Sequence, residues 1–493
     1  MSITNALNNA LSGLRANGRL ADITAGNLAN ALTPGYGRQE VALASSVTGT
    51  QGTGVRVAGV VRVTDPELST ARRMADGDLA ERATGHSALQ RLEAAFGTLE
   101  DPGSLGALLA RFEASLRALG DTPENGPRQQ AAAEAAGDLA AKFNALGQAV
   151  TDLRAQTDRG IASTVEATNT ALEGVARLNR QIQIAVAAGR ETAPLIDRRE
   201  ALIDQVAQAL PVRQSIRPDG VIELRTLEGI GLADVTARRL DYTATPVYEP
   251  GLRYDDGAGT LSGLTLQGID ITPGGPGAQA VRGGALAGLF ETRDTVAPEI
   301  ETQLDSLAAD LVTRLADPAI DTTLAPGDAG LFTDRGSAFA LADITGIASR
   351  IALNAAVDPA EGGDPALLRD GLNAASPGPS SEDGLLRALA DALSAPRDVT
   401  APPATPGLAG QLSLAERIDG VVERIGTARV GAELEVTTLS AAREALASQE
   451  TARLGVDTDL ELSRLVEIEQ AYAANAQVIQ TAARMLDELQ RIQ

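Results

Sequence analysis

Two heptad seams, one at each end of the chain, constrain the fold of this 493-residue sequence more than any other feature. In residues 3–32, small and apolar side chains alternate at four- and three-residue spacing, the pattern of a helix that packs along one narrow face. A second seam runs through residues 459–493. Period alone does not distinguish packing within one chain from packing between chains, so both remain open. If the two seams pair with each other, the chain folds in a hairpin-like plan with its ends together at one pole.

The residues of these seams are the candidate assembly interface, and they include one polar interruption. That residue, Asn475, either fixes the register of a helix pair or faces a channel, whereas Tyr472 is expected to pack in its seam. The N-terminal seam contains Leu7, Leu11, Leu14, Gly18, Ala21, Ala25, Leu28 and Leu32, and the C-terminal seam contains Leu465, Ile468, Tyr472, Asn475, Ile479, Ala482, Leu486 and Leu489.

A turn is expected to end the first helix, because proline disfavours helix at the preceding residue and glycine accepts positive φ. Asn27 and Asn30, one helical turn apart, are expected to hydrogen-bond the loop backbone and hold this turn in place. We include both asparagines and the turn in the candidate interface. The turn residues are Thr33, Pro34, Gly35 and Tyr36.

Between its ends the chain alternates long helical and short β-like patterns. Apolar alternation at 55–63 predicts two short strands or an extended arm, and residues 67–209 are mostly helical, with the longest helix over 128–188. Short β-like runs fill 212–272, helix returns at 284–315, and 317–405 is rich in Pro and Gly, which predicts surface loops or linkers around short elements. Thr458 and Glu461 form a capping-box pattern that predicts a helix start near Asp459.

The expected fold is mainly α with a β insertion: terminal helices in a coiled coil, an elongated helical-bundle middle and a small outer β-rich domain. The β insertion is expected to lie far from the chain ends. The predicted domains are 1–66 plus 452–493, 67–210 plus 284–316 plus 407–451, 211–283, and the Pro/Gly-rich stretch 317–406.

Composition excludes several classes of function. A net charge of −23 disfavours binding to nucleic acid, and no apolar stretch is long enough to insert into a membrane. The absence of Cys and the single His86, near an expected helix start, argue against a metal site, a cofactor or nucleophilic catalysis. Residues 1–43 carry three arginines and two acids, and residues 459–493 three arginines and six acids, so most of the charge lies between the ends.

Four stretches resemble one known family. ITAGNLANALTPGY at 23–36, with GRQ after it, is similar to the N-terminal motif of flagellar axial proteins, meaning the rod, hook and hook-associated proteins. GVRV at 54–57, LNRQI at 178–182 with LIDRREAL at 195–202, and EQAYAANAQVI at 469–479 are similar in the same order. The combination with a long helical middle points to the hook-associated members.

The resemblance implies a structural protein of the extracellular flagellum, exported by the flagellar type III apparatus without a cleaved signal peptide, and no enzyme. Its implied partners are further copies of itself in a helical ring, the hook protein, a second hook-filament junction protein and an export chaperone on the C-terminal helix. The terminal helices would line the channel and the β insertion would face outward. Two alternatives stay open: a hook or rod protein, and, remotely, a secreted carboxylate-based hydrolase using Asp255 or Asp256.

Overall fold

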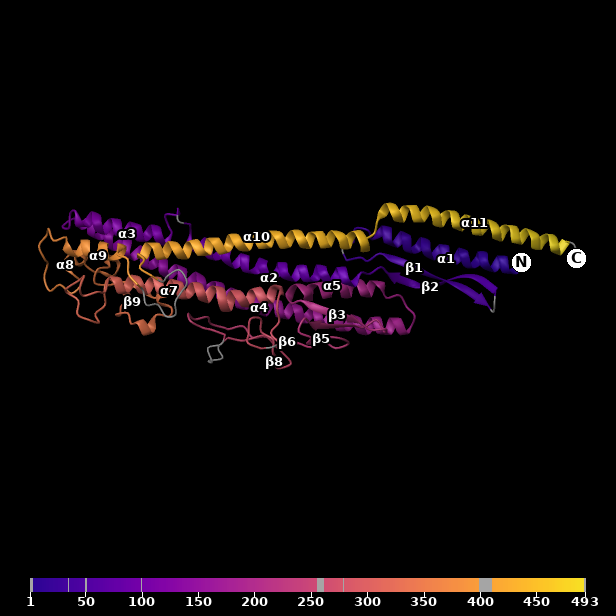
Figure 1. Cartoon of the computed structure of the whole chain (residues 1–493), viewed down its shortest axis with the longest axis horizontal. Coiled ribbons are helices and arrows are strands. Elements are labelled where there is room, and N and C mark those ends of the chain that lie inside the picture. The colour runs from indigo at the N-terminus through magenta and orange to yellow at the C-terminus, as the bar shows by residue number, and fades with distance from the viewer. Residues whose placement is uncertain are drawn as a thin grey trace.

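The computed structural model describes residues 3–33, 35–48, 51–98, 100–254, 261–277, 279–398 and 410–491. It is an elongated rod with both chain ends at the same pole, as the seams predict (Figure 1). The central helix α4 spans Gly126–Ala187, 62 residues, and is therefore about 90 Å long. Its start is set by Asn125, whose side chain accepts a hydrogen bond from the Arg128 N–H. The prediction of one long helix at 128–188 is thus confirmed.

The terminal unit, as we call residues 3–62 together with 458–491, contains two helices and one hairpin. Helix α1 spans Ile3–Ala29 and helix α11 spans Thr458–Arg491. Strands β1 (Gln39–Thr48) and β2 (Gln51–Arg62) pair antiparallel. The two short strands or extended arm predicted at 55–63 correspond to the single strand β2. Strand β1 was not predicted, because it contains several Ala and Ser residues, which have weak strand preference.

The helical body is built on α4 and has two separate hydrophobic cores along it. The N-terminal half of α4 packs with α2 (Pro66–Phe96), α3 (Leu105–Gly120), α7 (Ala297–Arg314) and the start of α10 (Leu414–Leu454). The C-terminal half packs with α5 (Ala193–Ala209) and α6 (Gly284–Glu291), and a π-helical turn, Thr292–Val296, joins α6 to α7. Among the described residues, the terminal unit contributes nothing to either core.

The β insertion consists of two small antiparallel sheets packed on the second core. One contains β3 (Val212–Ile216), β4 (Ile222–Thr226) and β5 (Gly231–Ala233), and the other β6 (Leu240–Asp241), β7 (Thr265–Leu266) and β8 (Ile269–Asp270). The β-like run at Val247 and Tyr248 is not a strand. The insertion lies beside the rod near its middle, away from the pole that holds the chain ends, because its apolar faces pack on α4 and α5 (Figure 1).

The pole opposite the chain ends contains the Pro/Gly-rich stretch, whose described part has short elements between loops, as predicted, but packs on the first core instead of staying at the surface. Strands β9 (Phe332–Asp334) and β10 (Ile351–Leu353), helices α8 (Leu367–Asp370) and α9 (Gly384–Ser394), and three 3-10 turns (Leu341–Asp343, Ile347–Ser349, Pro359–Glu361) make it compact. Phe332, Ile347 and Leu386 are fully buried in the first core. Elements this short are too brief to reveal a period in the sequence.

The start of α11 also differs from the capping-box prediction. The carboxylate of Asp457, one residue earlier, accepts hydrogen bonds from the N–H groups of Asp459 (3.0 Å) and Leu460 (3.1 Å). Glu461 is buried instead of capping. A capping box forms at the start of α10, between Ser413 and Glu416.

Two searches of the described residues gave negative findings. No helix there is both long and apolar enough to cross a bilayer. The same part of the chain has no group of three or more His, Cys, Asp or Glu side chains placed to bind a metal ion.

Candidate assembly surface at the chain ends

Helices α1 and α11 of the same chain run antiparallel and pack on each other (Figure 1). Gly13 lies opposite Asn475: a Cβ at position 13 would come within 2.9 Å of the Asn475 amide nitrogen. The seams therefore do pair within one chain, and Asn475 sits inside that pair.

The pair covers the predicted interface only in part. Among its members, Asn27 and Ala482 are buried. Half-buried are Leu7, Leu14, Ala21, Leu28, Asn30, Tyr36, Leu465, Ile468, Asn475 and Ile479. Leu11 (41%), Tyr472 (46%), Leu486 (41%) and Leu32 (97%) are exposed, as are Ala25, Thr33 and Gly35. Pro34 and the side chain of Leu489 lie outside the described residues.

The uncovered apolar surface includes a groove and one face of the hairpin. The groove, about 490 Å³, opens between the outer parts of α1 and α11 and is lined by Ile3, Val478 and Met485 among others. On one face of the hairpin, the paired residues Leu43 (46%) and Val57 (38%) are exposed, and so is Val47 (60%). Sequence reasoning missed the hairpin face because it missed β1. Exposed apolar patches of this kind mark interaction sites.

Asn27 holds the turn after α1 by three hydrogen bonds, as predicted. Its Oδ1 accepts from the Gln39 N–H (3.0 Å) and the Tyr36 hydroxyl (2.9 Å), and its Nδ2 donates to the Gln39 carbonyl (2.9 Å). Burial, followed by the charges of Asp197 and Glu461, raises the pKa of Tyr36, so the hydroxyl stays protonated. Asn30 bonds mainly within its own helix, to the Gly26 carbonyl.

A charged junction connects the terminal unit to the body. Asp197 on α5 accepts from the Arg62 guanidinium (2.6 Å) and from the Gly37 N–H (3.2 Å). Burial raises the pKa of Asp197 despite the favourable effect of Arg62. Because Arg62 and Gly37 belong to the terminal unit, this carboxylate connects the two parts directly.

Two adjacent arginines on α2 extend this junction. Arg72 pairs with Asp204 on α5 (2.8 Å) and with Glu450 on α10, while Arg73 bonds Asp204 (2.6 Å) and Glu200 (2.7 Å). Asp197 and Glu200 belong to the LIDRREAL stretch noted in the sequence, which was the one signal for this site. Nothing in the sequence indicated which basic residues would meet them.

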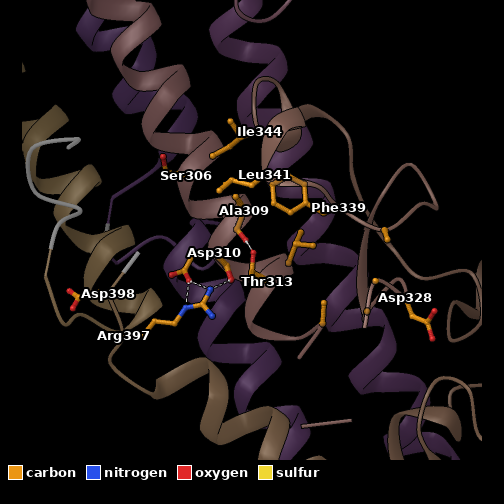
Figure 2. Close-up of a pocket in the computed structure, with 15 residues that line it drawn as sticks. Ser306, Ala309, Asp310, Thr313, Asp328, Phe339, Leu341, Ile344, Arg397 and Asp398 are labelled. Carbon is orange, nitrogen blue, oxygen red and sulfur yellow. Dashed lines mark hydrogen bonds and ion pairs between the residues drawn. The ribbon is translucent and has the colours of Figure 1, made fainter. Parts of the chain in front are cut away.

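The remote alternative of a carboxylate-based hydrolase finds no support in the described residues. A cavity of about 440 Å³ beside α7 contains Asp310, with Phe339 and Leu341 on its other side (Figure 2). The Asp310 carboxylate is paired with Arg397 (2.7 Å) and Arg314 (3.0 Å) and so is neutralised. Asp255 and Asp256 lie outside the described residues. His86 lies within α2 and not at a helix start.

Comparison with known proteins gives two matching family models. The model described as the flagellar hook-associated protein FlgK helical domain matches residues 89–317. The model described as the flagellar basal body rod FlgEFG protein C-terminal matches residues 451–492. The first covers most of the helical body and the second covers α11.

Three similar proteins from different bacteria have the same name, flagellar hook-associated protein 1. Flagellar hook-associated protein 1 of Bacillus subtilis (strain 168) is 25% identical over 330 residues, covering 61% of this chain and 64% of the relative. That of Salmonella typhimurium is 27% identical over 270 residues, covering 52% and 48%. That of Escherichia coli (strain K12) is 26% identical over 246 residues, covering 48% and 45%. The chain thus matches less than two thirds of the length of each.

A solved structure, the flagellar hook junction protein FlgK from Burkholderia pseudomallei, aligns with a TM-score of 0.43 and 19% identity over 54% of this chain and 46% of that one. The matches over the helical body and over the C-terminal helix are both to models of flagellar axial proteins. Within that class, the relatives that this chain resembles are flagellar hook-associated protein 1 of several bacteria.

Proposed function

We propose that this chain is a structural, non-enzymatic component of the extracellular flagellum that joins the hook to the filament. It assembles with copies of itself in a helical ring, contacting the hook protein on one side and a second junction protein on the other. It is exported by the flagellar type III apparatus without signal cleavage, with a chaperone covering α11 beforehand. The predicted domain limits and interface residues are part of this proposal.

The observation that carries the proposal is that the terminal unit lacks a core of its own while leaving apolar side chains uncovered. In the described residues, its buried apolar side chains are three alanines, Ala10, Ala16 and Ala482. Helices with so little burial gain most of their stability from packing against other elements. Further copies of the terminal unit would supply that packing.

The test is to replace exposed seam residues in a strain that lacks the native chain. Leu11→Asp and Leu486→Asp change side chains that are 41% exposed, so each variant should fold and be exported. We expect electron microscopy to show hooks without filaments and flagellin shed into the medium. Val247→Asp, which changes a 67% exposed residue outside the terminal unit, is the control and should give normal filaments.

Normal filaments in both seam variants would refute the role of the seams, and normal filaments in the deletion strain would refute the junction function. The alternative of a hook or rod protein is favoured only by the C-terminal match at 451–492. It predicts that the deletion removes or shortens the hook itself.

A further inference from the structure

A second cavity in the terminal unit is acidic. It measures about 310 Å³ and lies between α1, β1 and α11. Leu20 and Ile23 of α1 form its apolar wall. Its charged residues are Glu40 on β1 and Glu461, Arg464 and Glu467 on α11, so among the described residues that line it three acids face one base.

Glu461 is the least satisfied of these acids. It is 1% exposed, and its Oε1 lies 3.4 Å from the Arg464 guanidinium, a long contact for an ion pair. Its Oε2 has no hydrogen-bond donor within the described part of the chain. Arg464 is shared with Glu40 at 3.6 Å. Glu40 also has Arg38 at 3.4 Å, so the acid that lacks a close cation is Glu461. A buried carboxylate without a close partner is strongly unfavourable.

We propose that the cavity receives an arginine side chain from a second copy of this chain. A guanidinium is planar and has five N–H donors, so it can bond Glu461 and a rim carboxylate at once. Lysine is an unsuitable source, because the single lysine, Lys142, lies in the body and donates to the Ala95 carbonyl. This inference rests on the proposed self-assembly and adds which residues of two copies meet.

The terminal unit itself supplies candidate arginines. Arg15 on α1 and Arg484 on α11 are exposed, and the structure gives neither an ion pair nor a side-chain hydrogen bond among the described residues. Within one copy they cannot reach the cavity. Arg15 lies five residues before Leu20, the nearest lining residue on α1, about 7.5 Å along the helix, and helical side chains tilt toward the N-terminus, here away from the cavity. Arg484 lies sixteen residues after Ile468, about 24 Å along α11. The arginine that enters the cavity therefore comes from another copy. Because the two copies then contact each other through different surfaces, the contact is head-to-tail, the kind that builds a ring or a helical assembly.

Carbodiimide crosslinking tests this directly, because it joins an amine to a carboxylate in contact and the chain has only one native lysine. Arg15→Lys and Arg484→Lys keep the charge and introduce one amine each. A mixture of ¹⁴N- and ¹⁵N-labelled protein identifies links between copies by mass spectrometry. The sample is hook-filament structures detached from complemented cells, or concentrated purified protein if the chain does not enter flagella.

We expect a mixed-isotope link from one of the two positions to the α11 peptide containing residues 461–467. Glu461→Gln should reduce the yield of filaments, or of assemblies in purified protein, at least tenfold. Glu299→Gln, a change on helix α7 of the body, is the matched control and should have no effect.

Absence of the link in both lysine variants overturns the proposal, as does normal assembly of Glu461→Gln. If Glu461→Gln fails to assemble while neither position crosslinks, another cation occupies the cavity and the proposal is likewise wrong. Failure of the native chain to restore filaments would instead refute the junction function, so the two failures can be told apart.

Discussion

Replacing Asn27 with alanine should release the β hairpin from the end of α1. The Asn27 side chain is 1% exposed and makes three hydrogen bonds, two to the Gln39 backbone and one to the Tyr36 hydroxyl. Each such bond contributes about 1 kcal/mol, and groups left buried without a partner cost at least as much. The expected loss is therefore about 3 kcal/mol in the free energy of opening the hairpin.

Native-state hydrogen exchange measures this quantity segment by segment. A loss of about 3 kcal/mol corresponds to roughly a hundredfold faster exchange of the protected hairpin amides. Amides in α4 should be unaffected, because the hydrophobic cores around α4 contain no residue of the terminal unit.

Asn30→Ala is the matched control, since it changes the same residue type one helical turn away. Asn30 donates to the Gly26 carbonyl within its own helix and accepts only a 3.3 Å contact from Thr33. Loss of the Asn30 side chain should lower the free energy of opening the hairpin by under about 1 kcal/mol. If both variants accelerate exchange in the hairpin equally, the three bonds of Asn27 do not hold the hairpin in place and the reasoning is wrong.

Three further predictions concern other parts of the chain. Burial raises the pKa of Asp305 to about 7, so the folded state holds a proton that the unfolded state releases near pH 4. This contribution to stability should be full below about pH 4, fall by a few kcal/mol between about pH 4 and pH 7 and level off above that, and Asp305→Asn should flatten the dependence in denaturant titrations. Gly13→Leu should separate α1 from α11, as seen in faster exchange in α11, whereas Gly18→Leu, with nothing within 4 Å of the added Cβ among the described residues, should not. Arg72→Met should lower the unfolding free energy by about 2 kcal/mol, because Glu450 loses its arginine partner while Asp76 keeps Arg443 and Asp204 keeps Arg73, and an unchanged urea midpoint would contradict this.

Long helices were predictable because their periodicity extends over many turns. The pattern at 128–188 gave the central helix within two residues at its start, and Asn27 could be assigned to the turn because its side chain bonds backbone nearby in sequence. Strand β1 and the Phe332 region were missed or misjudged. Both consist of short segments that pair or pack with elements distant in the sequence. The local propensity of such a segment does not indicate which element it will contact.

The sequence by itself determined the long helices, the two seams at the chain ends and the resemblance to flagellar axial proteins, since each depends on repeated spacing or on contiguous motifs. Only the tertiary structure decided that α1 and α11 pair within one chain and still leave Leu11 and Leu486 uncovered. It also decided which charges meet, such as Arg62 with Asp197, and that Glu461 is buried without a full set of partners. Burial and charge pairing depend on how elements far apart in the sequence are placed, and a one-dimensional pattern does not contain that placement.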